Sequence, residues 1–414
     1  MKPQEKTSAD FDVVIVGGGI VGLSLACELA ATDFSVAVVE RNELKAIAET
    51  PDCRVSAINR FALQRFKQAG VWRSPLVQRA CIFDKMFVWD QTGAGQIQFD
   101  SVELGLSELG VIIENYILQH MLLETVTAAQ NISCFCPAEI ISIDYRPKAG
   151  GQSVSTVELS SGLRLCAALL VGADGVKSKI REIASIQRSQ QPYQQFGLVC
   201  NVATAESHQN TAWQCFMPTG PLAFLPLYNG YSSIVWTLDD DSAQSRMALS
   251  DEEFKRVLAE ESQYRLGEIT DVSQRFLFPL AHGHATEYVR PGLALIGDAA
   301  HSIHPLAGQG VNLGMADAAS LAEVLSSAKQ ARKDIGSLNV LRQYERWRRA
   351  DNRSMLVAMD GFKRLFSNQS SLLGWIRNTG MSLVQQTPLV KNTIVRHAMG
   401  LSGAQPKLAK GIEL

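Results

Sequence analysis

The chain has 414 residues, of which 46% are hydrophobic and 19% charged, and its formal net charge at pH 7 is −2. This balance indicates a globular protein of two or three lobes and argues against disorder and against nucleic-acid binding. The eight cysteines form no C-x-x-C pair, and neither they nor the seven histidines have zinc-ligand spacing, so we expect reduced thiols and no metal site.

The N-terminal segment predicts a dinucleotide cradle. A strand over 11–16 leads into a glycine-rich turn and a helical run over 23–31, and a second strand over 36–39 ends at Glu40 and Arg41. The turn residues are Gly17, Gly18, Gly19, Ile20, Val21 and Gly22. The first glycine makes the turn, the third admits a pyrophosphate and the last allows close helix packing, while the acid can bind ribose hydroxyls. This pattern suits FAD or NAD better than NADP.

The same stretch could be mistaken for a signal peptide or a membrane span, because residues 11–31 are mostly apolar. Asp12 and Glu28 interrupt the run, and three adjacent glycines would weaken a helix. We therefore expect neither feature and predict a cytoplasmic protein.

A second strand-to-turn motif lies at residues 165–181. An apolar strand over 165–171 ends at Asp174-Gly175 and leads into a helix in which Ser178 and Arg181 lie one turn apart. Asp174 is predicted to bond backbone groups or a ligand.

Between the turn motifs the chain is rich in strand signals. Residues 83–100 and 195–238 alternate apolar and polar side chains between turn residues, which predicts a mostly antiparallel sheet. Residues 251–261 predict a helix that begins with a capping box, Ser250 with Glu253. His282 and His284 follow in a predicted loop.

The most informative segment is 294–314. A buried strand ends at Gly297, so that Asp298 stands at the carboxyl edge of a doubly wound sheet, where ligands bind. A glycine-rich loop then leads into a helix that starts near Val311, whose free N–H groups stabilise negative charge on a reduced flavin. The loop and helix start contain Gly308, Gln309, Gly310, Val311 and Asn312. Asp298 is predicted to face the ribityl chain of the flavin.

No residue stands out as a catalytic base. His304 and Pro305 lie in the loop at the flavin face and are the catalytic candidates; His301 is adjacent, and a backbone-bonded structural role for a histidine here is the more common one. Pro305 stiffens the loop and offers no acid or base.

The C-terminal segment is basic. Residues 361–414 contain seven Lys or Arg and one acid, with apolar residues at helical spacing. Both a helical lobe packed on the protein and a contact with an anionic membrane surface fit this pattern. The charges Lys363, Arg364, Arg377 and Lys391 are the candidates for such a contact.

In this order, the three motifs resemble those of group A flavoprotein monooxygenases of the p-hydroxybenzoate hydroxylase type. Further stretches resemble the ubiquinone-biosynthesis hydroxylases, above all 304–314, together with 54–59, 223–227, 233–236 and 394–401. Among these the 2-polyprenylphenol hydroxylases match best and demethoxyubiquinone hydroxylases second, because the latter often carry Asn where this chain has His304. One departure is Asn115, where many members have Arg, so no flavin contact is assigned to Gln119.

The resemblance implies an α/β fold with a discontinuous, Rossmann-like FAD-binding domain, a mostly antiparallel β substrate domain and a C-terminal helical segment. The FAD-binding domain would comprise residues 1–75, 101–185 and 280–335, the substrate domain 76–100 and 186–279, and the helical segment 336–414. The resemblance also implies that Arg54 reaches the flavin.

The implied activity is hydroxylation of a polyprenylphenol ring by molecular oxygen through a flavin hydroperoxide, with NAD(P)H as electron donor. Missing C-x-x-C and second G-x-G-x-x-G motifs argue against disulfide and two-domain reductases. A flavin-containing assembly subunit and an isoprenoid flavin reductase remain alternatives. Partners would be other ubiquinone-biosynthesis proteins and the inner membrane surface, and homo-oligomerisation is left open.

Overall fold

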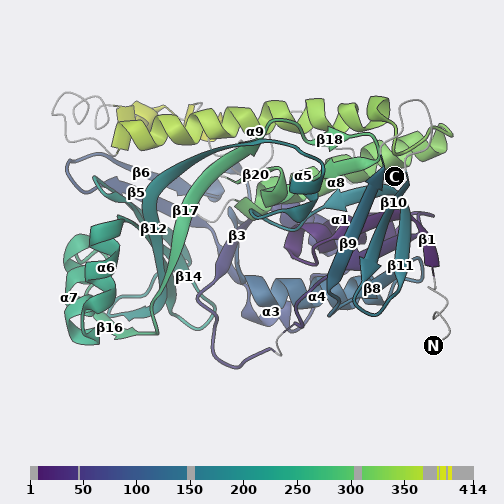
Figure 1. Cartoon of the computed structure of the whole chain (residues 1–414). Helices are drawn as coiled ribbons and strands as arrows, with labels where there is room; N and C mark the ends of the chain where they lie inside the picture. The colour runs from purple at the N-terminus through teal and green to yellow at the C-terminus, as the bar shows by residue number, and fades with distance from the viewer. Residues whose placement is uncertain are drawn as a thin grey trace.

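The structure is a computed structural model that describes residues 8–44, 47–146, 154–302, 310–366, 380–381, 383–387 and 390–393. Its strands form three sheets, and Figure 1 shows two of them side by side with one long helix running above both. That helix is α9 (Leu338–Phe366).

The first sheet has eight strands and carries the predicted dinucleotide cradle. Five of them are parallel neighbours in the order β19-β11-β1-β2-β8. In β1, β2, β11 and β19 the central residues are Val, Ile, Leu and Ala with almost no exposure, as expected for strands covered on both faces. The strands are β1 (Ser8–Val16), β2 (Val36–Val39), β8 (Ile132–Phe135), β9 (Ile140–Arg146), β10 (Val154–Leu159), β11 (Arg164–Gly172), β18 (Val289–Arg290) and β19 (Leu293–Leu295).

The longer helices of this half are α1 (Ile20–Ala30), α4 (Asn115–Thr127) and α8 (Gly310–Gln330). Helix α1 packs between α4 and α8, so the glycine turn at its start lies beside both. Glu28 of α1, which interrupts the apolar run in the sequence, forms a buried ion pair with Arg65. No helix among the described residues is both long and apolar enough to cross a membrane.

The second sheet has nine strands, and the predicted antiparallel arrangement is confirmed except where β13 runs parallel to β5. Its order is β20-β17-β12-β15-β14-β13-β5-β6, with β16 beside β12. The strands are β5 (Lys85–Asp90), β6 (Gln96–Asp100), β12 (Arg188–Thr204), β13 (Thr211–Met217), β14 (Gly220–Pro226), β15 (Ser232–Asp239), β16 (Ile269–Val272), β17 (Phe276–Ala285) and β20 (His301–Ser302). His282 and His284 thus lie in a strand, and the loop predicted for them is wrong because β17 continues past Pro279 along β12.

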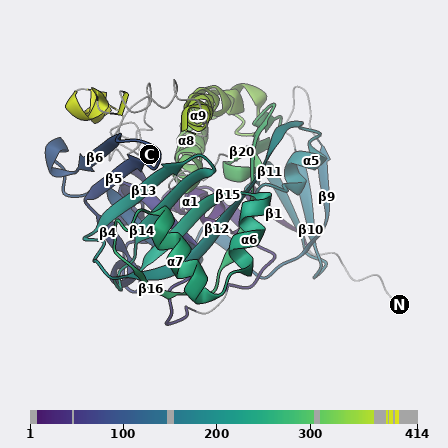
Figure 2. The same cartoon turned by 90° about the vertical axis from the view of Figure 1, so that its left-hand side faces the viewer.

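Helices α6 (Asp240–Ala248) and α7 (Asp251–Glu261) cover one face of this sheet, and Figure 2 shows them in front of it. The predicted helix 251–261 and its capping box of Ser250 with Glu253 are confirmed. Trp236, Phe254 and Leu258 fill the layer between helix and sheet. The opposite face, here called the inner face, is turned toward the cofactor-binding half.

The third sheet joins the two halves. It contains β3 (Val55–Asn59), β7 (Gly110–Glu114) and β4 (Cys81–Phe83), all antiparallel. Around it lie the short helices α2 (Arg60–Gln68), α3 (Leu76–Arg79) and η1 (Val102–Leu104). Strand β4 pairs with β7 rather than with the large sheet, and Cys81 and Ile112 of this third sheet share an apolar cluster with Ala212 and Ala223 of the large sheet.

Short C-terminal pieces return to the large sheet. Met381 packs on Val88 of β5, and Gln385 accepts a hydrogen bond from the backbone of Gln98. Lys391 is buried and pairs with Glu103 at 2.6 Å, so its expected role as a membrane-facing charge is wrong. The side chains of Lys363, Arg364 and Arg377 lie outside the described residues, as does the stretch 394–401.

Candidate functional site

The glycine turn forms an open cradle at the end of β1. Gly17 has φ +111°, a conformation that side chains disfavour, and a Cβ there would lie 2.3 Å from the carbonyl oxygen of Ala173. A Cβ on Gly22 would lie 2.0 Å from the oxygen of Gly17, whereas one on Gly19 would have no heavy atom within 4 Å. The turn therefore has no room for side chains at Gly17 and Gly22, where backbone packs on backbone, and is open at Gly19, as a pyrophosphate cradle requires.

Glu40 stands beside this turn. Its Oε2 accepts from the backbone N–H of Gly18 at 2.8 Å, and its Oε1 from that of Asn42 at 2.8 Å. Each carboxylate oxygen keeps a second acceptor position, which a ribose hydroxyl can use. Arg41 follows and is exposed. Gln119 of α4 donates to the carbonyl oxygen of Gly18 at 2.6 Å, so it supports the cradle from behind.

The Asp-Gly turn packs directly against the first motif, since the N–H of Ala173 donates to the oxygen of Val16. Asp174 caps the short helix α5 (Lys179–Ile183): its Oδ2 accepts from the N–H groups of Lys179 and Ile180 at 2.7 and 3.2 Å. Its Oδ1 is buried and has no hydrogen-bond partner within the described chain. Gly175 allows the turn with φ +79°. The carboxylate thus has one oxygen available for a ligand group.

The Gly-Asp turn, η2 (Gly297–Ala299), lies at the carboxyl end of β19. Gly297 has φ +58° and, like Ala299, is buried, whereas Asp298 between them is exposed. Val21 of α1 sits against this turn, because Cβ atoms on Gly297 and Gly314 would lie 3.1 and 2.4 Å from its methyl groups. The packing of α1 therefore sets how the turn presents Asp298.

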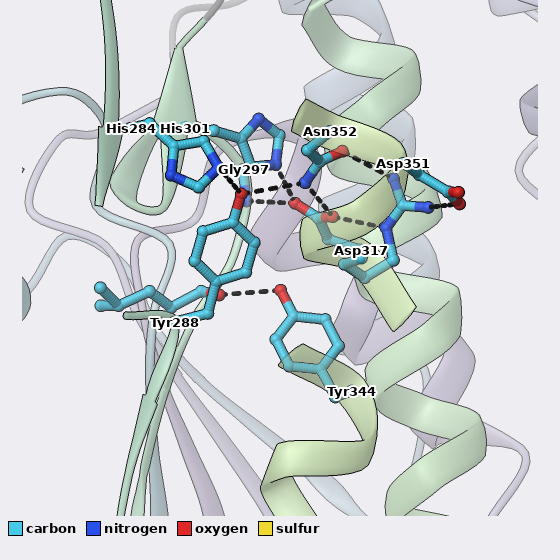
Figure 3. Close-up of polar contacts among 10 residues, drawn as sticks. His284, Tyr288, Gly297, His301, Asp317, Tyr344, Asp351 and Asn352 are labelled. Carbon is cyan, nitrogen blue, oxygen red and sulfur yellow. Dashed lines mark hydrogen bonds and ion pairs between the residues drawn. The ribbon is translucent and has the colours of Figure 1, made fainter. Parts of the chain in front are cut away.

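A buried polar network anchors this turn, and Figure 3 shows its members converging on Asp317 of α8. Asp317 accepts from the N–H of Gly297 at 3.0 Å, from Nε2 of His301 at 2.5 Å and from Nε of Arg348 at 2.8 Å. Burial alone would raise the pKa of Asp317, but the neighbouring His301 and Arg348 lower it to about 2. A fully buried carboxylate thereby stays ionised and holds the turn.

The network continues through Asn352, which donates to Asp317 and to the hydroxyl of Tyr288. Burial lowers the pKa of His284, so its ring is neutral. With Nδ1 donating to the oxygen of Ala285, Nε2 must accept from Tyr288, 2.8 Å away. Every member is thus satisfied, which marks the network, His301 included, as a scaffold.

Two arginines flank the same turn. Arg181 donates to the oxygens of Ala299 and Val176, both at 2.8 Å, and Arg188 donates to the oxygen of Val176 and to Ser302. Burial lowers the pKa of both guanidinium groups. They link the Asp-Gly and Gly-Asp motifs and bring positive charge to the side of Asp298.

At the junction with the third sheet, Arg54 lies with its guanidinium 5.6 Å from the ring centre of Phe278 of β17. Asn312 at the start of α8 uses its side chain on β3, donating to the oxygen of Ala57 and accepting from the N–H of Asn59. Its amide therefore fixes the helix start rather than projecting freely. Gly310 begins α8 with no heavy atom within 4 Å of a Cβ, and Val311 is half-buried.

Some expectations cannot be located. His304, Pro305 and Gly308 lie outside the described residues. Sequence reasoning missed Asp317, Arg348 and Asn352; the available signal was the single acid among the mostly small and apolar residues of 310–322. It also missed Arg188. In the described part of the chain no group of histidines, cysteines and acids could hold a metal.

The residues present fit FAD: an open Gly19, an acid at the end of β2, an unpartnered oxygen on Asp174 and an exposed Asp298 lie at one end of the parallel sheet. When bound, FAD accepts electrons and activates oxygen. These residues would hold its adenosine, pyrophosphate and ribityl parts.

Comparisons with known proteins agree with this geometry. Residues 10–358 match the family model described as FAD binding domain. The chain is 35% identical to the 3-demethoxyubiquinol 3-hydroxylase of Escherichia coli, over 95% of this chain and all of that protein. It is 34% identical to the mitochondrial ubiquinone biosynthesis monooxygenase COQ6 of Mus musculus, over 95% of this chain and 92% of that one.

Solved structures give the same fold. The p-nitrophenol 4-monooxygenase PnpA of Pseudomonas putida superposes with a TM-score of 0.76 at 19% identity, covering 96% of this chain and all of that one. The pqsL protein of Pseudomonas aeruginosa, a probable FAD-dependent monooxygenase, gives 0.74 at 21% identity, covering 90% and 100%. With the cradle, both acid turns and full-length relatives above 30% identity, the chain belongs to the FAD-dependent monooxygenases of ubiquinone biosynthesis.

Proposed function

We propose that this enzyme hydroxylates the aromatic ring of a polyprenylphenol, using molecular oxygen and FAD reduced by NAD(P)H. The observation that carries the proposal is the shared position of the cradle, Asp174 and Asp298 at one end of the parallel sheet, next to a large sheet whose inner face is apolar. An electron-rich ring and a long apolar tail suit such a face.

The contribution of the chain's own residues is binding and orientation. Asp298 and the start of α8 hold the flavin end of the site, and Asn312 ties α8 to β3, which faces the large sheet. The inner face excludes water from the ring. No described side chain is assigned a proton-transfer step.

A second candidate substrate is a demethoxyubiquinol, since the relative from E. coli is named as a hydroxylase of that compound. Both reactions place a hydroxyl on a prenylated ring and differ in the substituents already present. The preference for a polyprenylphenol comes from the resemblance of residues 304–314, of which 310–314 begin α8 and 304–309 lie outside the described residues.

The test is direct. Purified holoenzyme would be incubated with NADH or NADPH, labelled oxygen, and either a short-tailed 2-prenylphenol or a short-tailed demethoxyubiquinol. We expect one labelled oxygen in the ring product from the phenol and slower turnover of the other compound. Faster turnover of the demethoxyubiquinol would make that compound the preferred substrate. Oxidation of NADH or NADPH without a labelled product from either compound would reject both candidates.

We also propose that the protein works at the inner membrane surface with other ubiquinone-biosynthesis proteins. The support is the surplus of positive charge in residues 361–414, which attracts anionic headgroups at roughly 1 kcal/mol per exposed Lys or Arg. Replacing Lys363, Arg364 and Arg377 by Gln should weaken sedimentation with anionic liposomes at low salt. If the parent protein does not sediment with them, the membrane proposal fails.

A further inference from the structure

On the inner face of the large sheet lies the polar side chain of Gln214, a residue of β13. Cys215, its neighbour, points into the layer filled by α7, so strand alternation turns Gln214 to the inner face. The side chain is only 6% exposed. It is therefore a neutral amide buried on the face that looks toward the cofactor-binding half.

Gln214 lies at the boundary between two apolar clusters. Ala212, two residues before it, and Ala223, its partner on β14, belong to the cluster shared with β3, β4 and β7. Phe216, two residues after it, and Val88, its partner on β5, belong to the cluster capped by Met381. One side of the amide thus faces the third sheet and the other faces the C-terminal piece.

This boundary is close to the flavin end of the site. Ala57 of β3 packs against the first cluster through its side chain, and its carbonyl oxygen accepts from Asn312 at the start of α8. A single residue therefore connects the surroundings of Gln214 to the helix start that faces the cofactor.

The amide is not satisfied by the protein. Its Oε1 is buried and has no hydrogen-bond partner in the part of the chain that the structure describes. An unpaired buried carbonyl is costly, since it has lost its water and gained nothing in return. A carbonyl oxygen in apolar surroundings gains its missing hydrogen bond from a ligand that is mostly apolar and carries one hydroxyl group.

We propose that Gln214 is the anchor for the ring hydroxyl of the substrate, with Oε1 accepting the phenolic O–H while the apolar tail lies along the neighbouring clusters. This inference rests on the proposed function and assigns a position to its substrate. A neutral amide suits the task because it orients a phenol without burying a charge. Gln214 would be a positioning residue and would move no proton.

The experiment compares two ligands on oxidised holoenzyme, a short-tailed 2-prenylphenol and its methyl ether, which cannot donate. Binding is followed by the change in flavin absorbance. We expect the parent protein to bind the phenol about tenfold more tightly than the ether, the effect of one buried hydrogen bond. Gln214→Leu should bind both alike and keep its FAD. Its unfolding temperature should be unchanged or higher, because an unpaired polar group has been removed.

Gln96→Leu, at an exposed position on β6, is the matched control and should leave the discrimination unchanged. If Gln214→Leu still prefers the phenol tenfold, the anchor is elsewhere and the inference is overturned, while the proposed function stands as long as the phenol is hydroxylated. If Gln214→Leu loses FAD, Gln214→Met repeats the measurement with a side chain closer in length. Loss of FAD in both would show a structural role and overturn the inference. Failure of the parent protein to bind or hydroxylate either ring compound rejects the proposed function itself.

Discussion

At the scale of single residues, two glycines of the first turn are expected to respond oppositely to a side chain. Gly19→Val points into open space, so the fold should survive, but the side chain occupies the place of the pyrophosphate and FAD should be lost. Gly22→Ala drives a Cβ against the oxygen of Gly17 and should lower stability, by about 1–3 kcal/mol as overpacking does. Flavin content after gel filtration and urea unfolding separate the two. A yellow Gly19→Val protein with normal FAD affinity would show that the pyrophosphate does not bind at Gly19.

Asp298 gives the second prediction. Its exposed carboxylate lies between buried neighbours, so Asp298→Ala should leave folding intact. It should weaken FAD binding by roughly tenfold to a hundredfold, the loss of charge-assisted hydrogen bonds. Titration of apoprotein with FAD measures this. Asp271→Ala, exposed and bonded to Tyr231, is the control. An effect below about twofold would remove Asp298 from the site.

The site residues that could be predicted from the sequence are those with an unusual backbone conformation or a characteristic spacing. Gly17, Glu40 and Asp298 could be placed because a turn fixes each one next to a strand end. Asp317 and Arg348 could not, because their meeting depends on how α8 and α9 pack and no local pattern encodes it. Gln214 could not be predicted either, because a single polar residue in a strand is common and its burial is known only from the structure.

At the scale of elements, the ion pair between α8 and α9 is expected to decide stability. Asp317→Asn leaves the guanidinium of Arg348 without its buried charge partner and should cost about 3–5 kcal/mol of unfolding free energy. Asp351→Asn removes the half-exposed partner of the same arginine and should cost at most about 1 kcal/mol. Urea unfolding compares them. Equal losses would show that the buried Asp317 stabilises the fold no more than the half-exposed Asp351 does.

The neutral ring of His284 predicts a pH dependence. Burial lowers its pKa in the fold, whereas the unfolded chain binds a proton below about 6.5. The unfolded state therefore holds more protons in that window, and stability should fall as the pH drops from about 7.5 to about 5.5. His284→Gln should flatten this slope in part, since burial also lowers the pKa of His208. An unchanged slope in the variant would assign it to other groups.

Elements were predictable where period and turn agreed, as in 36–39 and 251–261, whose bounds the structure reproduces. The predictions failed where pairing with a distant strand determines the structure of a segment. His282 and His284 were predicted to lie in a loop after Pro279, yet β17 continues through both of them along β12. Phe83, the first residue of the alternating stretch 83–100, pairs with Gly110 of β7 instead of joining the large sheet.

At the scale of the whole molecule, Lys391 ties the C-terminal pieces to η1, which follows β6 of the large sheet. Lys391→Gln should break the pair with Glu103 and speed proteolysis near residues 380–393 several-fold, by about threefold to tenfold for a loss near 1 kcal/mol. Glu103→Gln should do the same, and the double variant should add little. Lys333→Gln, at an exposed position, is the control. Additive effects would show that the two residues act separately.

The bond between Asp317 and Arg348 also has a consequence for synthesis on the ribosome. Every flavin-holding motif lies before residue 318, yet the carboxylate that fixes the last of them is compensated by an arginine 31 residues later. A nascent chain that has exposed all three motifs therefore carries this buried acid with His301 beside it but without the arginine. Because segments fold as they emerge, the site matures only when α9 leaves the exit tunnel, and chains arrested before Arg348 should reach the chaperones without cofactor.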